Sequence, residues 1–101
     1  MKQLFTIVIL FVSFPLLAQL GSIKGKVIDG TTQEPVPFAN VVIEGTQNGT
    51  ATDFDGNFTI SNVNPGYVKL DISVVGYERK LSEDLFVTPS KTPFVGIKLN
   101  S

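Results

Sequence analysis

The chain has 101 residues, with 8 Lys and Arg against 9 Asp and Glu, and it contains no Cys, His or Trp. A formal net charge of -1 provides no positive field to attract nucleic acid or anionic lipid. Without His and Cys the chain cannot form the usual zinc site, a cysteine nucleophile or an imidazole base.

Residues 1–18 have the pattern of a secretory signal peptide. Lys2 precedes an almost unbroken apolar run that would be only about 21 Å long as a helix, shorter than the ~30 Å hydrocarbon core of a bilayer. The run ends at the small residue Ala18, so cleavage is expected after Ala18, or alternatively after Gln19. The remaining residues, 19–101, are expected to form one exported domain.

The exported part is rich in Val, Ile, Thr and Phe and is divided by Gly and Pro, which is typical of short strands. A further segment, Tyr77–Thr88, also fits a helical spacing, but we favour a strand there. Seven strands without crossover helices predict an all-β fold, a seven-stranded antiparallel Greek-key β-sandwich. The other expected strands are Ser22–Asp29, Ala39–Glu44, Thr50–Asp53, Asn57–Ser61, Tyr67–Val75 and Val95–Leu99.

Residues that tolerate positive φ or accept local backbone hydrogen bonds separate these strands. Asn-Gly and Asp-Gly pairs between alternating segments are signals of tight hairpin turns. A lone glycine after the long alternating segment predicts a bend. The residues assigned to structural turns are Asn48, Gly49, Asp53, Asp55, Gly56, Asn57 and Gly76.

The oxygen-rich turn also suggests a calcium loop, because Asp53, Asp55 and Asn57 are spaced two residues apart. The EF-hand spacing fails, however. When Asp53 takes the first position, the glycine position holds Phe58 and the bidentate glutamate position holds Asn64. We therefore expect a structural turn, with no metal and no other cofactor.

Catalytic assignments have little support. A glycosidase pair of carboxylates needs a sugar-binding cleft between the two groups, and nothing else in the chain suggests one. The serine residues have no imidazole partner, because the chain has no His. We expect no catalytic residues and no enzymatic activity.

Three aromatic residues, Tyr67, Tyr77 and Phe94, occupy positions in the alternation that allow partial exposure. Such rings bind sugars or partner surfaces, or they cap a small core. For Tyr77 we favour a bend at Gly76 that turns the ring against the sheet. A small sandwich also has edge strands, and an edge strand can accept a strand from another chain.

The order and spacing of several short segments resemble the carboxypeptidase-D regulatory-like domain, over nearly all of Ser22–Leu99. The resemblance implies a transthyretin-like (prealbumin-like) sandwich that is not catalytic. The segments that carry it are Gly25-Lys26-Val27-Ile28-Asp29, Glu34-Pro35-Val36-Pro37-Phe38-Ala39-Asn40-Val41, Gly45-Thr46, Gly49-Thr50, Thr52-Asp53-Phe54-Asp55-Gly56-Asn57-Phe58-Thr59-Ile60 and Val75-Gly76-Tyr77.

Domains of this family occur beside the catalytic domain of zinc carboxypeptidases and after the signal peptide of SusC-type TonB-dependent outer-membrane receptors of Bacteroidetes. The arrangement of signal and then domain is similar to the receptor case, although no plug or barrel follows Leu99 in these residues. The resemblance implies a non-catalytic accessory module of the cell envelope, free-standing or a truncated receptor start. Two alternatives are a periplasmic carbohydrate- or peptide-binding module and a regulatory domain associated with a zinc carboxypeptidase.

The expected location is the periplasm or the outer membrane, with no transmembrane span in the mature chain. The expected partner is an outer-membrane or periplasmic protein that docks through an edge strand. Nucleic acid is not an expected partner.

Overall fold

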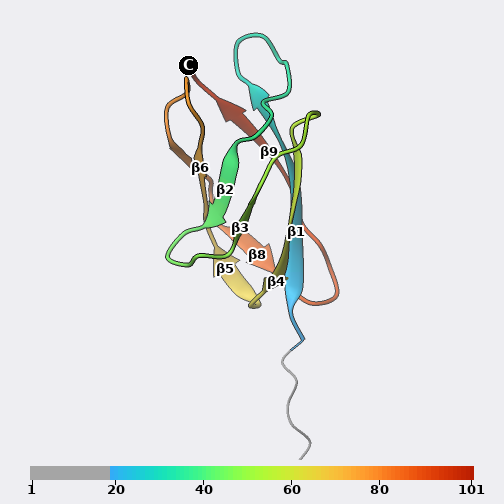
Figure 1. Cartoon of the computed structure of the whole chain (residues 1–101). Coiled ribbons are helices and arrows are strands. Elements are labelled where there is room, and N and C mark those ends of the chain that lie inside the picture. The colour runs from blue at the N-terminus through green and yellow to red at the C-terminus, as the bar shows by residue number, and fades with distance from the viewer. Residues whose placement is uncertain (1–18) are drawn as a thin grey trace, which may run out of the picture.

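The computed structural model describes residues 19–101, and the predicted signal peptide at residues 1–18 lies outside this part of the chain (Figure 1). The all-β prediction is confirmed, and Tyr77–Thr88 forms strands. Within residues 19–101 no helix is long and apolar enough to cross a membrane. The strands are β1 (Gly21–Asp29), β2 (Asn40–Ile43), β3 (Gly49–Ala51), β4 (Asn57–Val63), β5 (Gly66–Val68), β6 (Leu70–Ser73), β7 (Lys80–Leu81), β8 (Leu85–Val87) and β9 (Phe94–Leu99).

The strands form a sheet in the order β4-β1-β9, a sheet in the order β3-β2-β6-β7, and a two-stranded sheet of β5 and β8. Figure 1 places β1 and β4 on one side of the molecule and β2 and β6 on the other. The expected alternation holds in these strands, because the inward positions are apolar and buried. The core contains Ile23, Val27, Val36, Ala39, Val41, Ile43, Phe58, Ile60, Val63, Leu70, Ile72, Val87, Ile97 and Leu99.

The first and last strands, β1 and β9, depart from the expected antiparallel arrangement. They pair in parallel, from Lys24 opposite Phe94 to Asp29 opposite Leu99. Such a pairing is possible because the whole of the intervening chain provides the long connection that parallel neighbours require. The five other ladders are antiparallel and join β1 with β4, β2 with β3, β2 with β6, β5 with β8, and β6 with β7.

The count of nine strands, against the expected seven, arises from two segments that are each divided. The expected strand Tyr67–Val75 changes sheet at Lys69: Val68 pairs with Leu85 in the two-stranded sheet, and Leu70 pairs with Ile43 in the four-stranded sheet. The segment Tyr77–Thr88 is divided in the same way into β7 and β8. Both divided segments therefore connect the four-stranded sheet with the two-stranded sheet.

Candidate functional site

Asp53 organises the turn that precedes β4. Its Oδ1 accepts hydrogen bonds from the backbone N–H groups of Asp55 and Asn57, both at 2.9 Å. Gly56 has a φ of 77°, and its backbone N–H donates to the Asp53 carbonyl oxygen at 2.9 Å. The Asp53 carboxylate is thus engaged inside the turn, and in residues 19–101 no three acidic side chains gather to hold a metal ion.

The turn between β2 and β3 differs from the sequence expectation for Asn48 and Gly49. The positive φ lies at Gly45, with a value of 84°, because Gly49 is already paired in β3. The side-chain amide of Asn48 instead donates to the carbonyl oxygens of Ser61 and Asn62, at 3.0 Å and 3.3 Å. Asn48 therefore ties this turn to the end of β4.

A second bend, at Gly76 with a φ of 93°, directs Tyr77 back against the core. The Tyr77 hydroxyl donates a hydrogen bond of 2.8 Å to Oδ2 of Asp29. Oδ1 of Asp29 accepts from the backbone N–H groups of Thr31 and Thr32 at 2.7 Å and 3.0 Å. Tyr77 is therefore half-buried and hydrogen-bonded to Asp29 in β1, so little of its surface is accessible to a ligand.

These hydrogen bonds shift two pKa values in opposite directions. The backbone N–H of Thr32, followed by the Tyr77 hydroxyl, lowers the pKa of Asp29 below its ordinary value of 3.8. The hydrogen bond to Asp29 raises the pKa of Tyr77 above its ordinary value of 10.0. The interaction needs an ionised Asp29 and a protonated Tyr77, so it is present only between the two folded-state values.

We expect Tyr77→Phe to destabilise the domain most at neutral pH. Because the folded pKa of Asp29 is depressed, the stability that its ionised form contributes is complete above pH 3.8. This stability is lost as the pH falls through the lowered pKa. Because the folded pKa of Tyr77 is raised, the stability that its protonated form contributes is complete below pH 10.0. This stability is lost as the pH rises through the raised pKa. Urea unfolding across the pH range should show that the difference in free energy of unfolding between wild type and Tyr77→Phe becomes smaller at low pH and at high pH. Tyr67→Phe is the control, and a pH-independent difference for Tyr77→Phe would contradict the assignment.

Tyr67 on β5 is an exposed aromatic, with 74% of its surface accessible. Its cross-strand neighbour on β8 is Phe86, and the two ring centroids lie 4.8 Å apart with an interplanar angle of 47°. Tyr67 also lines an open hollow of about 550 Å³ between the β2–β3 turn, the β4–β5 turn and the segment before β8. Phe86 packs against one side of the Tyr67 ring, and the remaining surface of the ring is accessible.

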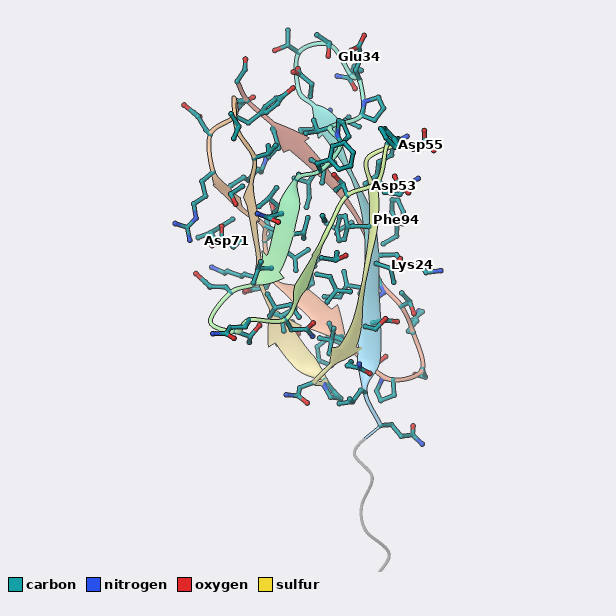
Figure 2. All side chains as sticks on the ribbon, viewed as in Figure 1. Lys24, Glu34, Asp53, Asp55, Asp71 and Phe94 are labelled. Carbon is teal, nitrogen blue, oxygen red and sulfur yellow. The ribbon has the colours of Figure 1, made fainter. Side chains whose placement is uncertain are left out.

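Phe94 lies on the outer face of the β4-β1-β9 sheet and is 69% exposed. It borders a largely apolar groove of about 240 Å³ together with Ile28 and Gly96 and the side chains of Lys26 and Lys98. Figure 2 shows Phe94 close to Lys24 beside β1, in agreement with their register. The outward positions of β1, β4 and β9 therefore combine an aromatic ring with lysines.

This outer face carries lysine side chains on its outward positions. The outward positions carry Lys24, Lys26 and Lys98 and no Asp or Glu. Within residues 19–101 the ion pair that forms is between Arg79 and Asp71, on the other sheet. The lysines of the outer face are therefore available to an acidic partner.

The free edge of β9 borders the same face. Carbonyl oxygens of Pro93 and Leu99 point toward β1, so alternate residues present their backbone groups to the opposite edge. At the C-terminal end this edge is covered, because Lys98 O accepts from Lys80 Nζ at 3.0 Å. Around Gly96, β9 pairs with β1 alone, and a hollow of about 310 Å³ separates its edge from the segment leading into β8.

Sequence reasoning did not identify the aromatic partners of the exposed rings. Phe86 stands opposite Tyr67, and Phe38 packs edge-on against Phe54 with 5.1 Å between the centroids. All of these rings are more than half exposed. Phe54 lies inside the Asp-Phe-Asp-Gly turn, where an apolar residue between two carboxylates is a detectable signal of exposure. Phe86 lies in the segment whose periodicity is ambiguous.

The sequence matches the family model described as CarboxypepD_reg-like domain over residues 23–100. It is 46% identical over 69 residues to the TonB-dependent receptor SusC of Bacteroides thetaiotaomicron, a match that covers 68% of this chain and 7% of that receptor. It is 40% identical over 76 residues to the TonB-dependent receptor P39 of Formosa agariphila, covering 73% of this chain and 7% of that receptor. The chain thus spans a small fraction of these relatives.

Solved structures with the same fold come from several settings. A type II cohesin–X-dockerin complex from Acetivibrio cellulolyticus matches with a TM-score of 0.65 and 21% identity, over 78% of this chain and 56% of that chain. The group B streptococcus pilus 2b backbone protein matches with a TM-score of 0.60 and 20% identity, over 80% and 41%. A putative carbohydrate binding protein from Bacteroides uniformis gives 0.56 and 18%, over 77% and 40%. At these identities the likeness concerns the β-sandwich fold alone.

Proposed function

Because the chain belongs to the CarboxypepD_reg-like domain family, we propose that it is a non-catalytic, exported interaction module of the cell envelope. Its similarity to two TonB-dependent receptors, each over 7% of the receptor's length, supports a role like that of an accessory domain of such receptors. The transport activity of a whole receptor is not part of the proposal. The proposed location is the periplasm or the outer membrane.

The chemistry of the described surface supports a binding role over a catalytic one. Asp53, one of the two carboxylates in the turn before β4, accepts hydrogen bonds from two backbone N–H groups of its own turn. Asp29 is occupied by Tyr77 and two further backbone groups. The accessible features include aromatic rings, lysines and a strand edge, which are recognition elements.

The free edge of β9 is the observation that carries the proposal. The occupant we propose is an extended segment of an outer-membrane or periplasmic protein, added to the sheet as a strand. Its acidic side chains face the lysines of the outer face, away from Glu83 and Asp84, which line the hollow beside the β9 edge. Backbone groups around Gly96 supply hydrogen bonds to such a strand. Lys98 and the neighbouring β1 lysines supply charge complementarity to its outward carboxylates, and Phe94 supplies apolar contact.

The other long edge, that of β4, is less suited to this role. Asn57 O accepts from Asp53 N at 2.9 Å, and Ser61 O accepts from the Asn48 amide at 3.0 Å. These contacts cover the groups on either side of Thr59 and interrupt any continuous ladder. Of the two edges, β9 therefore offers the longer run of unpaired backbone groups to a partner strand.

Site-specific photocrosslinking in intact cells tests the proposal. A benzophenone side chain at Phe94 is expected to give one discrete adduct, and the adduct should weaken when Lys24, Lys26 and Lys98 are replaced by Glu. The matched control places the same side chain at Phe54, which is 77% exposed on a different surface. An envelope protein in the adduct supports the proposal. Equal adducts at both positions, no adduct, or a zinc carboxypeptidase as the captured partner would contradict it.

A further inference from the structure

The hollow beside Tyr67 lies away from Phe94 and the outer-face lysines, and it shares only Asp84 with the hollow beside the β9 edge. Its volume is about 550 Å³, and its walls come from three separate stretches of the chain: the β2–β3 turn, the β4–β5 turn with β5, and the segment before β8. Figure 1 shows β5 and β8 beside each other at one end of the molecule. The hollow is thus formed by the fold and not by a single loop.

One wall of the hollow is an aromatic platform. Tyr67 is 74% exposed, and its contact with Phe86 across the strand pair restrains the ring from one side. A restrained aromatic ring stacks on a flat apolar surface with little loss of conformational entropy. The C–H face of a pyranose ring is such a surface.

The other walls carry planar polar groups. They include the amides of Asn48, Asn62 and Asn64 and the carboxylates of Glu44 and Asp84. The Asn48 amide nitrogen is already used for Ser61 O and Asn62 O, which orients its free carbonyl oxygen rigidly. Such groups pair with neighbouring hydroxyls, since each amide can both donate and accept and each carboxylate accepts.

Asn62 is held in a costly backbone conformation at the border of this hollow. Its φ is 58°, and it lies in the β-bulge where the register between β1 and β4 shifts, between Ile60 and Val63. Bulges and left-handed non-glycine residues gather at functional sites, where they change the direction of a side chain. The positive φ of Asn62 and the bulge therefore both lie at the border of the hollow.

We infer that this hollow binds a neutral sugar, with the ring of Tyr67 stacked on a pyranose face and the asparagine amides and Glu44 and Asp84 paired with its hydroxyl groups. The charge of the lining selects against acidic sugars, because two carboxylates face a single lysine, Lys69. Purely apolar ligands are disfavoured because they would bury these polar groups without partners. The inference does not depend on the docking function proposed for β9.

NMR titration of the ¹⁵N-labelled chain tests this site. The probes are cellohexaose, xylohexaose and mannohexaose, with hexagalacturonate as the acidic sugar and triglycine as the non-sugar probe, each at up to about 10 mM. We expect saturable shift changes at the backbone amides of Asn48, Asn62, Asn64 and Tyr67 with at least one neutral hexasaccharide. Hexagalacturonate is expected to bind more weakly, and the double variant Glu44→Gln, Asp84→Asn should narrow that difference.

Matched aromatic variants separate this site from the outer face. Tyr67→Ala should weaken binding about fivefold to tenfold, whereas Tyr67→Phe should keep most of the affinity because it keeps the ring. Phe94→Ala removes a similarly exposed ring elsewhere and should leave the affinity unchanged. Absence of saturable shifts with every neutral sugar, an equal response to triglycine, or a loss with Phe94→Ala but not Tyr67→Ala would overturn the inference.

Discussion

Replacing Gly25 by valine is expected to lower the free energy of unfolding by about 3 kcal/mol. Gly25 lies in β1 between Phe58 of β4 and Val95 of β9. A Cβ atom there would lie 2.4 Å from the carbonyl oxygen of Val95 and 2.5 Å from the Phe58 ring. The backbone oxygen cannot move without breaking the ladder, and the ring fills the space that a side chain would need. Urea denaturation followed by circular dichroism measures the change.

Gly96 provides the matched control for this variant. It lies in β9 of the same sheet, opposite Lys26, and apart from its two chain neighbours no residue comes within 4 Å of the place a Cβ would take. Gly96→Val should change the free energy of unfolding by no more than about 0.5 kcal/mol. Equal losses for the two variants would mean that crowding against Val95 and Phe58 does not account for the effect.

The course of β1 illustrates what sequence patterns can establish. Alternation predicts Ile23, Gly25 and Val27 on the inner face and the lysines outside, and burial agrees. The pattern also marks Gly25 as an inward position without a side chain. It does not identify the group that occupies the vacant space, because Phe58 reaches it through the pairing of β1 with β4, which depends on the fold.

The division of Tyr67–Val75 between two sheets cannot be predicted from such patterns. Alternation continues through Lys69 without a break, since both faces keep their character when a strand leaves one sheet and joins another. What changes is the pairing partner, from Leu85 for Val68 to Ile43 for Leu70. Pairing is a property of distant segments, so a period of two residues contains no information about it.

The candidate sites show the same limit. Alternation singles out Tyr67 and Phe94 as exposed rings, and both are accessible. Tyr77 shares their chemistry, yet its hydroxyl is joined to Asp29, 48 residues away in the chain. The asparagines beside Tyr67 come from turns that appear separately in the sequence, and only the assembled sandwich places them around one hollow.

Thr52→Val is expected to lower the free energy of unfolding by about 2–4 kcal/mol although it conserves side-chain volume. Thr52 is only 2% exposed. Its Oγ1 donates to the carbonyl oxygen of Val36 at 2.7 Å and accepts from the backbone N–H of Ala39 at 2.8 Å. Both backbone groups belong to buried residues, so valine leaves a donor and an acceptor without partners in an apolar environment.

Thr52→Ser separates the hydroxyl from the methyl group. Serine keeps both hydrogen bonds and loses one buried methyl, so its expected cost is about 1 kcal/mol. Urea denaturation of the three proteins should therefore rank threonine above serine and serine above valine. The opposite order of the two variants would mean that the loop before β2 is held by packing of Val36 and Ala39 alone. The hydroxyl is expected to decide the order because those two backbone groups have no other protein partner and lie beyond the reach of solvent.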